Sequence, residues 1–221
     1  MMKIADTDDL LTAVESIPLF PLPGAVFIPH TMMPLHVFEE RYRNLVNDAI
    51  QHDGFLAIPR LRPGWESTYD EQPPIYSVAG FGKIIRHELL ADGRANIVIL
   101  GLGRIRIRSE LATDCMYRIA EGLLVSDVFP DRGESELMAH VRRLRMMVVQ
   151  VCASRPQWAE RVEPLLNNQT DPVAFVNALA HLTLPDVDAR QRYLEIDRVL
   201  DRISTVESVL AGALTSSVVH A

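Results

Sequence analysis

Between residues 35 and 51, apolar residues recur at spacings of three, four and seven, which is the period of an amphipathic helix. The residues of this stripe are Leu35, Phe38, Tyr42, Leu45, Val46 and Ala49. Glu39 and Glu40 fall in the first turns, where acidic side chains suit the positive end of the helix dipole. Asp53-Gly54 supplies a stop signal. The pattern predicts a helix over residues 35–51 with its apolar face toward a core.

The segments around this helix carry the patterns of strands. Residues 17–28 predict one or two short extended segments, and their prolines should leave these strands peripheral or broken, because proline cannot donate a ladder hydrogen bond. FLAIP at 55–59 predicts a further strand, and residues 75–108 and 117–129 are dense in strand signals.

Turn residues divide the long strand region. Asp92-Gly93 between two apolar runs predicts a hairpin. Four more glycines interrupt the strands, as bulges or barrel corners do: Gly80, Gly82, Gly101 and Gly103. Residues 17–129 therefore predict a mainly β unit, a small closed or half-closed barrel with one helix. The turn-rich segment 60–74 predicts a long, flexible loop within it.

After a composition break at residues 129–135, the pattern becomes helical. A clean stripe is formed by Leu137, Val141, Leu144, Val148 and Val151. Asp171-Pro172 predicts a capped helix start, and Asp188 with Gln191 resembles a capping box for the last helix. The chain is thus expected to be α+β, with a flexible leader over 1–13, a barrel lobe over 14–130 and a helical bundle over 131–221.

Composition narrows the class of protein. The 221 residues carry a formal net charge of −7, which argues mildly against nucleic acid or an anionic membrane as the main partner. The apolar runs are too short for a transmembrane helix, and the acidic N-terminus does not resemble an export signal. A cytoplasmic location is therefore expected. Cys115 and Cys152 form no CxxC pair and predict free thiols.

Catalytic motifs are missing from the sequence. There is no GxxxxGK[ST] phosphate loop, no GxSxG and no ligand-spaced histidine cluster, so no cofactor, metal or catalytic residue is predicted. Arg104, Arg106 and Arg108 alternate with isoleucines, as on the solvated face of a half-buried strand; the alternative is a surface that follows RNA phosphates.

Four side chains are candidates for contacts with another protein. Met32 and Met33 are flexible and apolar, a combination favoured where a surface must accept varied apolar partners. Trp65 and Tyr69 lie in the predicted loop and could offer exposed aromatic contacts. Plain packing between lobes would explain the same residues.

The proline-rich stretch resembles the signature of the Lon protease N-terminal (substrate-binding) domain family. The resemblance covers roughly residues 15–214. The matching segments are PLFPLPG at 18–24, Pro29, PLHVFEERY at 34–42, YSVAG at 76–80, Asp92-Gly93, GLGR at 101–104 and QRYLE at 191–195, with Arg192-Tyr193 as a departure. It implies a PUA-like β pseudobarrel followed by a helical bundle, in a free-standing form without the ATPase and protease domains.

These observations favour a non-enzymatic protein-binding module. It would hold unfolded or apolar protein segments, or act as an adaptor to a proteolytic or chaperone assembly. The first alternative is RNA binding, because PUA-like barrels occur in RNA-modifying proteins. The second is a hydrolase or transferase whose site is assembled in space. The sequence leaves the partner and the oligomeric state open.

Overall fold

The computed structural model describes residues 6–69, 71–167 and 171–218. The chain divides into two compact units, Met1–Val125 and Ser126–Ala221, so the boundary lies a few residues before the expected one at 130. The first unit contains α1 (Thr7–Glu15), β1 (Ile17–Leu19), β2 (Met32–Val37), α2 (Glu40–Gln51), β3 (Phe55–Ile58), the 3-10 turn η1 (Trp65–Thr68), β4 (Val78–Leu89), β5 (Ala95–Leu111) and β6 (Arg118–Leu124). The second contains α3 (Glu134–Ser154), α4 (Pro156–Asn167), α5 (Pro172–Thr183), α6 (Val187–Leu194) and α7 (Val199–Val218). The expected α+β class with a helical C-terminal part is confirmed.

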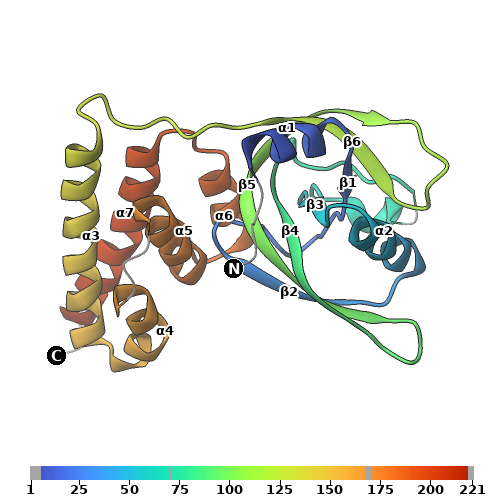
Figure 1. Cartoon of the computed structure of the whole chain (residues 1–221). Helices are drawn as coiled ribbons and strands as arrows, with labels where there is room; N and C mark the ends of the chain where they lie inside the picture. The colour runs from blue at the N-terminus through green and yellow to red at the C-terminus, as the bar shows by residue number, and fades with distance from the viewer. Residues whose placement is uncertain (1–5, 70, 168–170, 219–221) are drawn as a thin grey trace. The chain divides into compact units, whose positions relative to one another are not determined.

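The six strands follow the order β2-β5-β4-β3-β1-β6, and β5 also pairs with β6 (Figure 1). The long β5 makes this possible, because its first half pairs with β2 and its second half pairs with β6. The ring β5-β4-β3-β1-β6 is thereby closed, while β2 lies at the end of the strand order. The predicted hairpin is present, since β4 and β5 pair antiparallel around Gly93, which has φ +80°.

Two apolar clusters lie on opposite sides of β3. Leu56 and Ile58 belong to the cluster that receives the buried face of α2. Phe55 and Ala57 belong to the other cluster, which includes Val14 of α1. This division follows from the strand itself, because successive side chains point to opposite faces of a sheet.

The predicted helix over residues 35–51 begins too early. Residues 32–37 are β2, and α2 starts at Glu40. The apolar positions Leu35 and Phe38 fit the helical stripe only by coincidence, because Leu35 alternates within a strand and Phe38 is 62% exposed. Pairing of residues 32–37 with the first half of β5 makes this segment a strand, and that long-range contact is not contained in the local apolar period.

Three further expectations are corrected. Residues 7–13 of the expected flexible leader are helical, and Asp6 and Asp9 form a capping box. The strand Ile17–Leu19 is short but not peripheral, because it pairs with both β3 and β6 and both of its end residues are fully buried. The predicted last helix is two helices, α6 and α7, and the cap of α6 is Asp186 rather than Asp188.

The second unit is held by apolar stripes and one buried polar cluster. All five residues of the predicted stripe on α3 are buried, and Asp171 caps α5 through the amides of Val173 and Ala174 as expected. The Asn177 side-chain oxygen accepts hydrogen bonds from the Tyr193 hydroxyl at 2.7 Å and from the Arg202 guanidinium at 3.3 Å.

The glycines of β4 and β5 mark a close backbone crossing. A Cβ on Gly80 would lie 1.8 Å from the Phe27 carbonyl oxygen, and a Cβ on Gly101 would lie 2.8 Å from the Ile28 carbonyl oxygen. Phe27 and Ile28 are fully buried, so this segment cannot move aside cheaply. Gly80 and Gly101 are therefore needed where the Phe27–Ile28 backbone packs directly against β4 and β5.

We expect Gly80→Ala to lower the free energy of unfolding by roughly 2–4 kcal/mol, because the new methyl group meets backbone rather than a movable side chain. Chemical denaturation measures the change. Gly24→Ala is the control, since nothing lies within 4 Å of its added methyl group. Equal stability of both variants would contradict the close crossing.

Candidate protein-docking face

The strand β2 presents one row of side chains to solvent and one to the core. Met32, Pro34 and His36 are exposed, whereas Met33 and Leu35 pack against the core cluster beneath. Met32 is 63% exposed, an unusual state for a large apolar side chain inside a strand. On β5, Leu100 pairs with Met32, Val98 with Pro34, and Asn96 with His36. We call this surface, together with Arg86 and Glu88 of β4, the β2–β5–β4 face.

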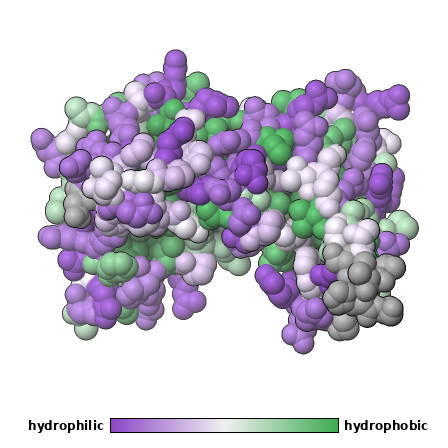
Figure 2. Space-filling model, turned by 180° about the vertical axis from the view of Figure 1, so that it is seen from behind, coloured by the Kyte–Doolittle hydropathy of each residue, from purple (hydrophilic) through white to green (hydrophobic). Residues whose placement is uncertain are grey.

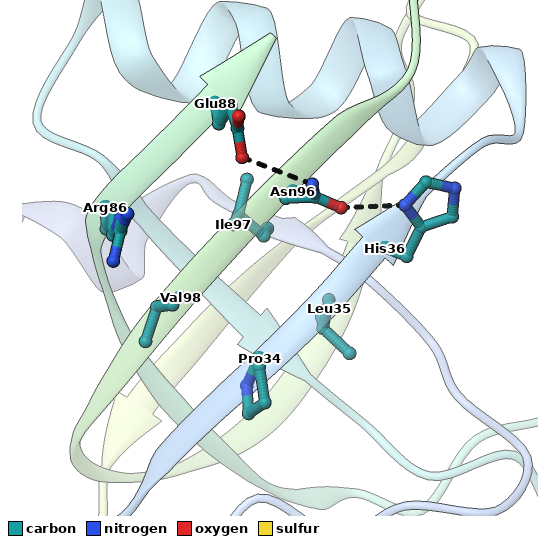
Figure 3. A pocket seen from close by; sticks show the side chains of 8 residues that line it. All are labelled: Pro34, Leu35, His36, Arg86, Glu88, Asn96, Ile97 and Val98. Carbon is teal, nitrogen blue, oxygen red and sulfur yellow. Dashed lines mark hydrogen bonds between the residues drawn. The ribbon is translucent and has the colours of Figure 1, made fainter. Parts of the chain in front are cut away.

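A shallow hollow of about 320 Å³ lies on this face (Figure 3). Pro34 and Val98 form its apolar floor, and Arg86 and Glu88 from β4 border it. Opposite charges at the border and an apolar floor fit a segment of protein whose apolar side chains are flanked by polar ones.

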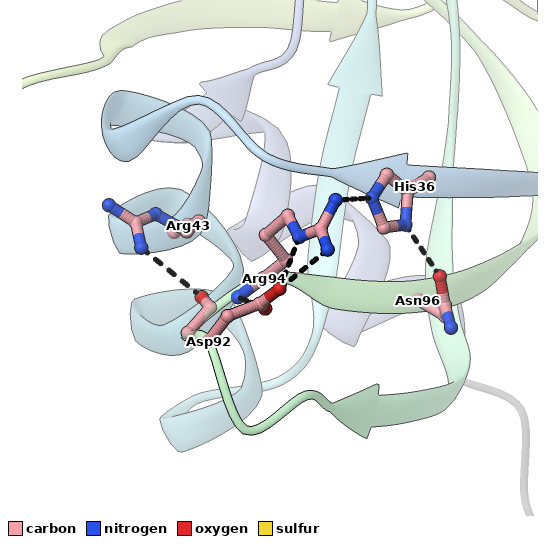
Figure 4. Close-up of polar contacts among 6 residues, drawn as sticks. His36, Arg43, Asp92, Arg94 and Asn96 are labelled. Atoms are coloured by element: carbon pink, nitrogen blue, oxygen red, sulfur yellow. Dashed lines mark hydrogen bonds and ion pairs between the residues drawn. The ribbon is translucent and has the colours of Figure 1, made fainter.

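A row of polar side chains closes one end of the hollow (Figures 3 and 4). The Asn96 amide donates to Glu88 at 3.3 Å, and the Asn96 carbonyl oxygen lies 2.8 Å from His36 Nδ1. Arg94 Nη1 lies 3.5 Å from His36 Nε2, and Arg94 Nε donates to Asp92 at 2.7 Å. These side-chain and backbone hydrogen bonds from Arg94 lower the pKa of Asp92 to about 2.

Hydrogen bonding determines which way the β2 backbone faces. The Gly101 amide donates to the Thr31 carbonyl, so Gly101 turns its hydrogen-bonding groups toward β2. In an antiparallel pair this orientation repeats every second residue, and Met33 and Leu35 lie two and four residues after Thr31. Their amides therefore point to β5. The amide positions of Met32, Pro34 and His36 point to the outer edge of β2. Proline has no amide hydrogen, so the middle of this edge cannot donate to an added strand.

The structure places the four predicted contact residues at two locations. Met32 lies on the β2–β5–β4 face, and Met33 packs beneath it. Trp65 and Tyr69 are half-buried in the loop that contains η1, where their rings meet edge to face with centroids 5.4 Å apart. The loop residue Asp70 lies outside the described residues.

Tyr69 fastens this loop to the start of α2. Its hydroxyl donates to Glu39 at 2.6 Å, and Glu39 also accepts from Arg41 at 2.8 Å. The Arg41 guanidinium lies 4.7 Å from the ring centroids of both Tyr42 and Tyr69. Burial, as the main cause, raises the pKa of Tyr42 to about 12. The FEERY residues therefore hold the loop in place as well as forming the helix start.

Two exposed apolar side chains at the ends of β2 and β4 were not predicted as contact residues. Phe38 follows β2, and Leu89 ends β4, and they are 62% and 63% exposed. Phe38 was assigned to a buried helical stripe. No local residue signals the difference, because β2 is set by its pairing with β5.

The arginines of β5 do not form one continuous row on the surface. Arg104 is only 3% exposed, whereas Arg106 and Arg108 are exposed and Arg108 lies 3.8 Å from Glu121. Hence two of the three guanidinium groups face solvent and one of these has an acidic neighbour.

The surface also carries other features that bear on function. Figure 2 shows apolar patches between hydrophilic ones on both units. Among the described residues, no helix is long and apolar enough to cross a membrane. Within the same part of the chain, no group of three or more His, Cys, Asp or Glu side chains is placed to hold a metal ion.

Comparison with known proteins identifies the family. The family model described as "ATP-dependent protease La (LON) substrate-binding domain" matches residues 16–212. The chain therefore belongs to the Lon substrate-binding domain family. This agrees with the resemblance that begins at the proline-rich stretch.

Related proteins and structures agree. The chain is 27% identical over 207 residues to a Lon protease of Trichlorobacter lovleyi, covering 92% of this chain and 25% of the relative. It is 31% identical over 185 residues to Lon protease 2 of Syntrophobacter fumaroxidans, covering 82% and 22%. The chain thus spans about a quarter of the length of these curated relatives.

Two solved structures share the fold. The N-terminal domain of a Mycobacterium avium complex Lon protease has a TM-score of 0.68 at 17% identity, covering 89% of this chain and 98% of that one. A Lon N-terminal domain protein from Xanthomonas campestris has a TM-score of 0.59 at 21% identity, covering 87% and 97%.

We expect Arg94→Ala to move the pKa of Asp92 from about 2 back toward its ordinary value of 3.8, because Arg94 supplies the hydrogen bonds that stabilise the carboxylate. The native pair stabilises the fold at pH values above the ordinary pKa, and this contribution is lost as the pH falls from about 4 toward 2. Carboxyl NMR titration measures both values. Arg43→Ala is the control, since Arg43 contacts Gly93 and should leave the pKa low.

We also expect Tyr69→Phe to lower the free energy of unfolding by about 1 kcal/mol, because Glu39 loses a hydrogen-bond donor. Hydrogen exchange should accelerate in Trp65–Thr68. Tyr76→Phe is the matched control, as its hydroxyl donates to none of the described residues. Unchanged exchange in the Tyr69 variant would show that the hydroxyl does not fasten the loop.

Proposed function

We propose that this chain is a non-enzymatic protein-binding module that recognises apolar segments of other proteins through the β2–β5–β4 face. The observation that carries the proposal is the exposure of Met32 within a strand whose neighbouring floor, Pro34 and Val98, is also apolar. Exposed apolar surface rimmed by polar side chains tends to mark a protein interaction site. Membership of the Lon substrate-binding domain family supports the same role.

The bound segment lies across the face rather than extending the sheet. Pro34 removes the central amide donor from the free edge of β2, so strand addition would lose a hydrogen bond at its middle. Side-chain contacts with Met32 and Val98 then supply the binding energy. Methionine suits this task because its flexible thioether chain adapts to different apolar partners.

Trp65 and Tyr69 are proposed as a second contact region. Both rings are partly exposed; the Tyr69 hydroxyl is bonded to Glu39, and the Trp65 ring meets the Tyr69 ring edge to face. A loop held in place loses less entropy on binding than a free loop. Met33 supports Met32 from beneath, since its side chain packs against the core.

The finer role is that of an adaptor that presents client segments to a proteolytic or chaperone assembly. The curated relatives are Lon proteases, and this chain corresponds to about a quarter of their length. The RNA-binding alternative has no support, because Arg104 is buried and the formal net charge is −7.

The test is binding of a reduced, carboxymethylated and therefore unfolded protein, measured by fluorescence anisotropy. Met32→Ser combined with Phe38→Ser should weaken binding about tenfold or more, because Met32 lies on the face and the exposed Phe38 ring lies 6.3 Å from the ring of His36 at its end. Trp65→Ser should weaken it further. Circular dichroism confirms that each variant is folded.

A matched control comes from the helical unit. Met146 and Val149 of α3 are 66% and 55% exposed, so replacing both with Ser removes exposed apolar side chains from the other unit of the chain. This control should leave affinity unchanged. The proposal is wrong if the control loses as much affinity as the β2 variant, or if the β2 variant loses none.

A further inference from the structure

We propose that a second cavity of the barrel unit binds an ammonium group carried on an apolar body. The cavity has a volume of about 500 Å³ and lies between the end of α1, the C-terminal turn of α2 and the first residues of β3. This volume falls within the range of small-ligand pockets. It is separate from the β2–β5–β4 face, whose hollow has none of the same lining residues.

The charge of the lining selects a cation. Asp48 and Asp53 contribute carboxylates, and the described lining contains no Lys or Arg. The C-terminal end of α2 also borders the cavity, and the negative end of a helix dipole favours a cation, although the His52 and Gly54 amides already donate to the Ala49 carbonyl. Asp53 is exposed and Asp48 is half-buried, so a ligand can reach both.

The Asp48 carboxylate can accept a further hydrogen bond. Asp48 Oδ2 accepts the Tyr117 hydroxyl at 2.8 Å, whereas Oδ1 accepts no hydrogen bond from the described residues. Asp48 takes part in no ion pair within the same part of the chain. The lining also contains one histidine, and the His52 ring lies 2.8 Å from the Asp48 backbone carbonyl, so this ring is already engaged at the end of α2. An ammonium group offers the donors that Oδ1 lacks.

The remaining wall is apolar and suits the body of the ligand. Ala13, Pro18, Ala49, Phe55 and Ile119 line this side. A purely polar cation would leave these side chains facing water, whereas an alkyl or aryl chain would cover them. The chemistry is therefore that of an amphiphilic amine, which could be a free amine or the lysine side chain of a protein segment.

The experiment uses the full chain labelled with ¹⁵N and three small probes: benzylamine, benzyl alcohol and phenylacetate. Benzylamine should shift the amide signals of the residues around Asp48 and Phe55, and added NaCl should weaken the effect by screening. The neutral and anionic probes should bind at least about tenfold more weakly, because an ion-paired hydrogen bond is lost. A short acetylated and amidated peptide with one lysine between leucines tests the second source.

Two variants test the cavity without disturbing the core. Asp48→Asn with Asp53→Asn keeps an oxygen to accept the Tyr117 hydroxyl but removes both charges, and should weaken benzylamine binding about tenfold. Thr12→Trp fills the cavity from an exposed position and leaves the charges intact, and it should also weaken binding. Asp8→Asn with Glu66→Gln makes the same change in net charge elsewhere on the unit and should have no effect.

The probes distinguish a free amine from the lysine side chain of a protein segment as the source of the ammonium group. Binding of benzylamine alone indicates a free amine, and binding of the peptide indicates a lysine of a protein segment. The proposal is overturned if neither probe shifts the lining signals, if benzyl alcohol binds equally well, or if the charge-matched control loses as much affinity as the cavity variants. None of these results depends on client binding at Met32.

Discussion

The close crossing of the Phe27–Ile28 segment over β4 and β5 is the constraint on which the barrel unit depends. Gly80 and Gly101 leave the room that this buried backbone needs, and any side chain there would collide with a carbonyl oxygen. Once the segment is held, His30 turns the chain with a left-handed φ of 64°, and its amide donates to Gly101. β2 can then begin at Met32 along the first half of β5.

The proposed docking face follows from this arrangement. Among the described strands β2 pairs with β5 alone, so one of its edges has no strand partner there, and because it is a strand, alternate side chains face solvent. Pro34 removes one amide donor from this edge and so disfavours pairing with a strand of another chain, which would lead to aggregation. The side-chain face of the same strand is still available for binding. On another side of the same unit, α1 and α2 enclose a cavity of opposite character, with carboxylates instead of exposed methionine.

Much of the fold could be predicted from the sequence, and the failures have local causes. Repeating apolar stripes found α3, and the Asp92-Gly93 turn found the hairpin, because both signals are local. The helix was predicted to start too early because Leu35 and Phe38 fit the helical spacing, although Leu35 belongs to the two-residue alternation of a strand. The strand β1 lies inside the sheet because it pairs with β3 and β6, which are distant in sequence. No residue near β1 indicates this pairing. The cavity beside Asp48 was likewise hidden, since its walls come from five separate elements and the loop before β6.

The position of β1 also bears on how the unit is made. Ile17 lies near the start of the chain, yet it pairs with Ala120 on β6 and its strand lies parallel to β3. The ring of strands therefore cannot close during synthesis until β6 has left the ribosome. Until then the apolar side chains of Ile17 and Leu19 have no permanent neighbours, and such a nascent strand is exposed to chaperones and to mispairing. A domain proposed to bind apolar segments of other proteins thus passes through a stage in which its own first strand is an exposed apolar segment.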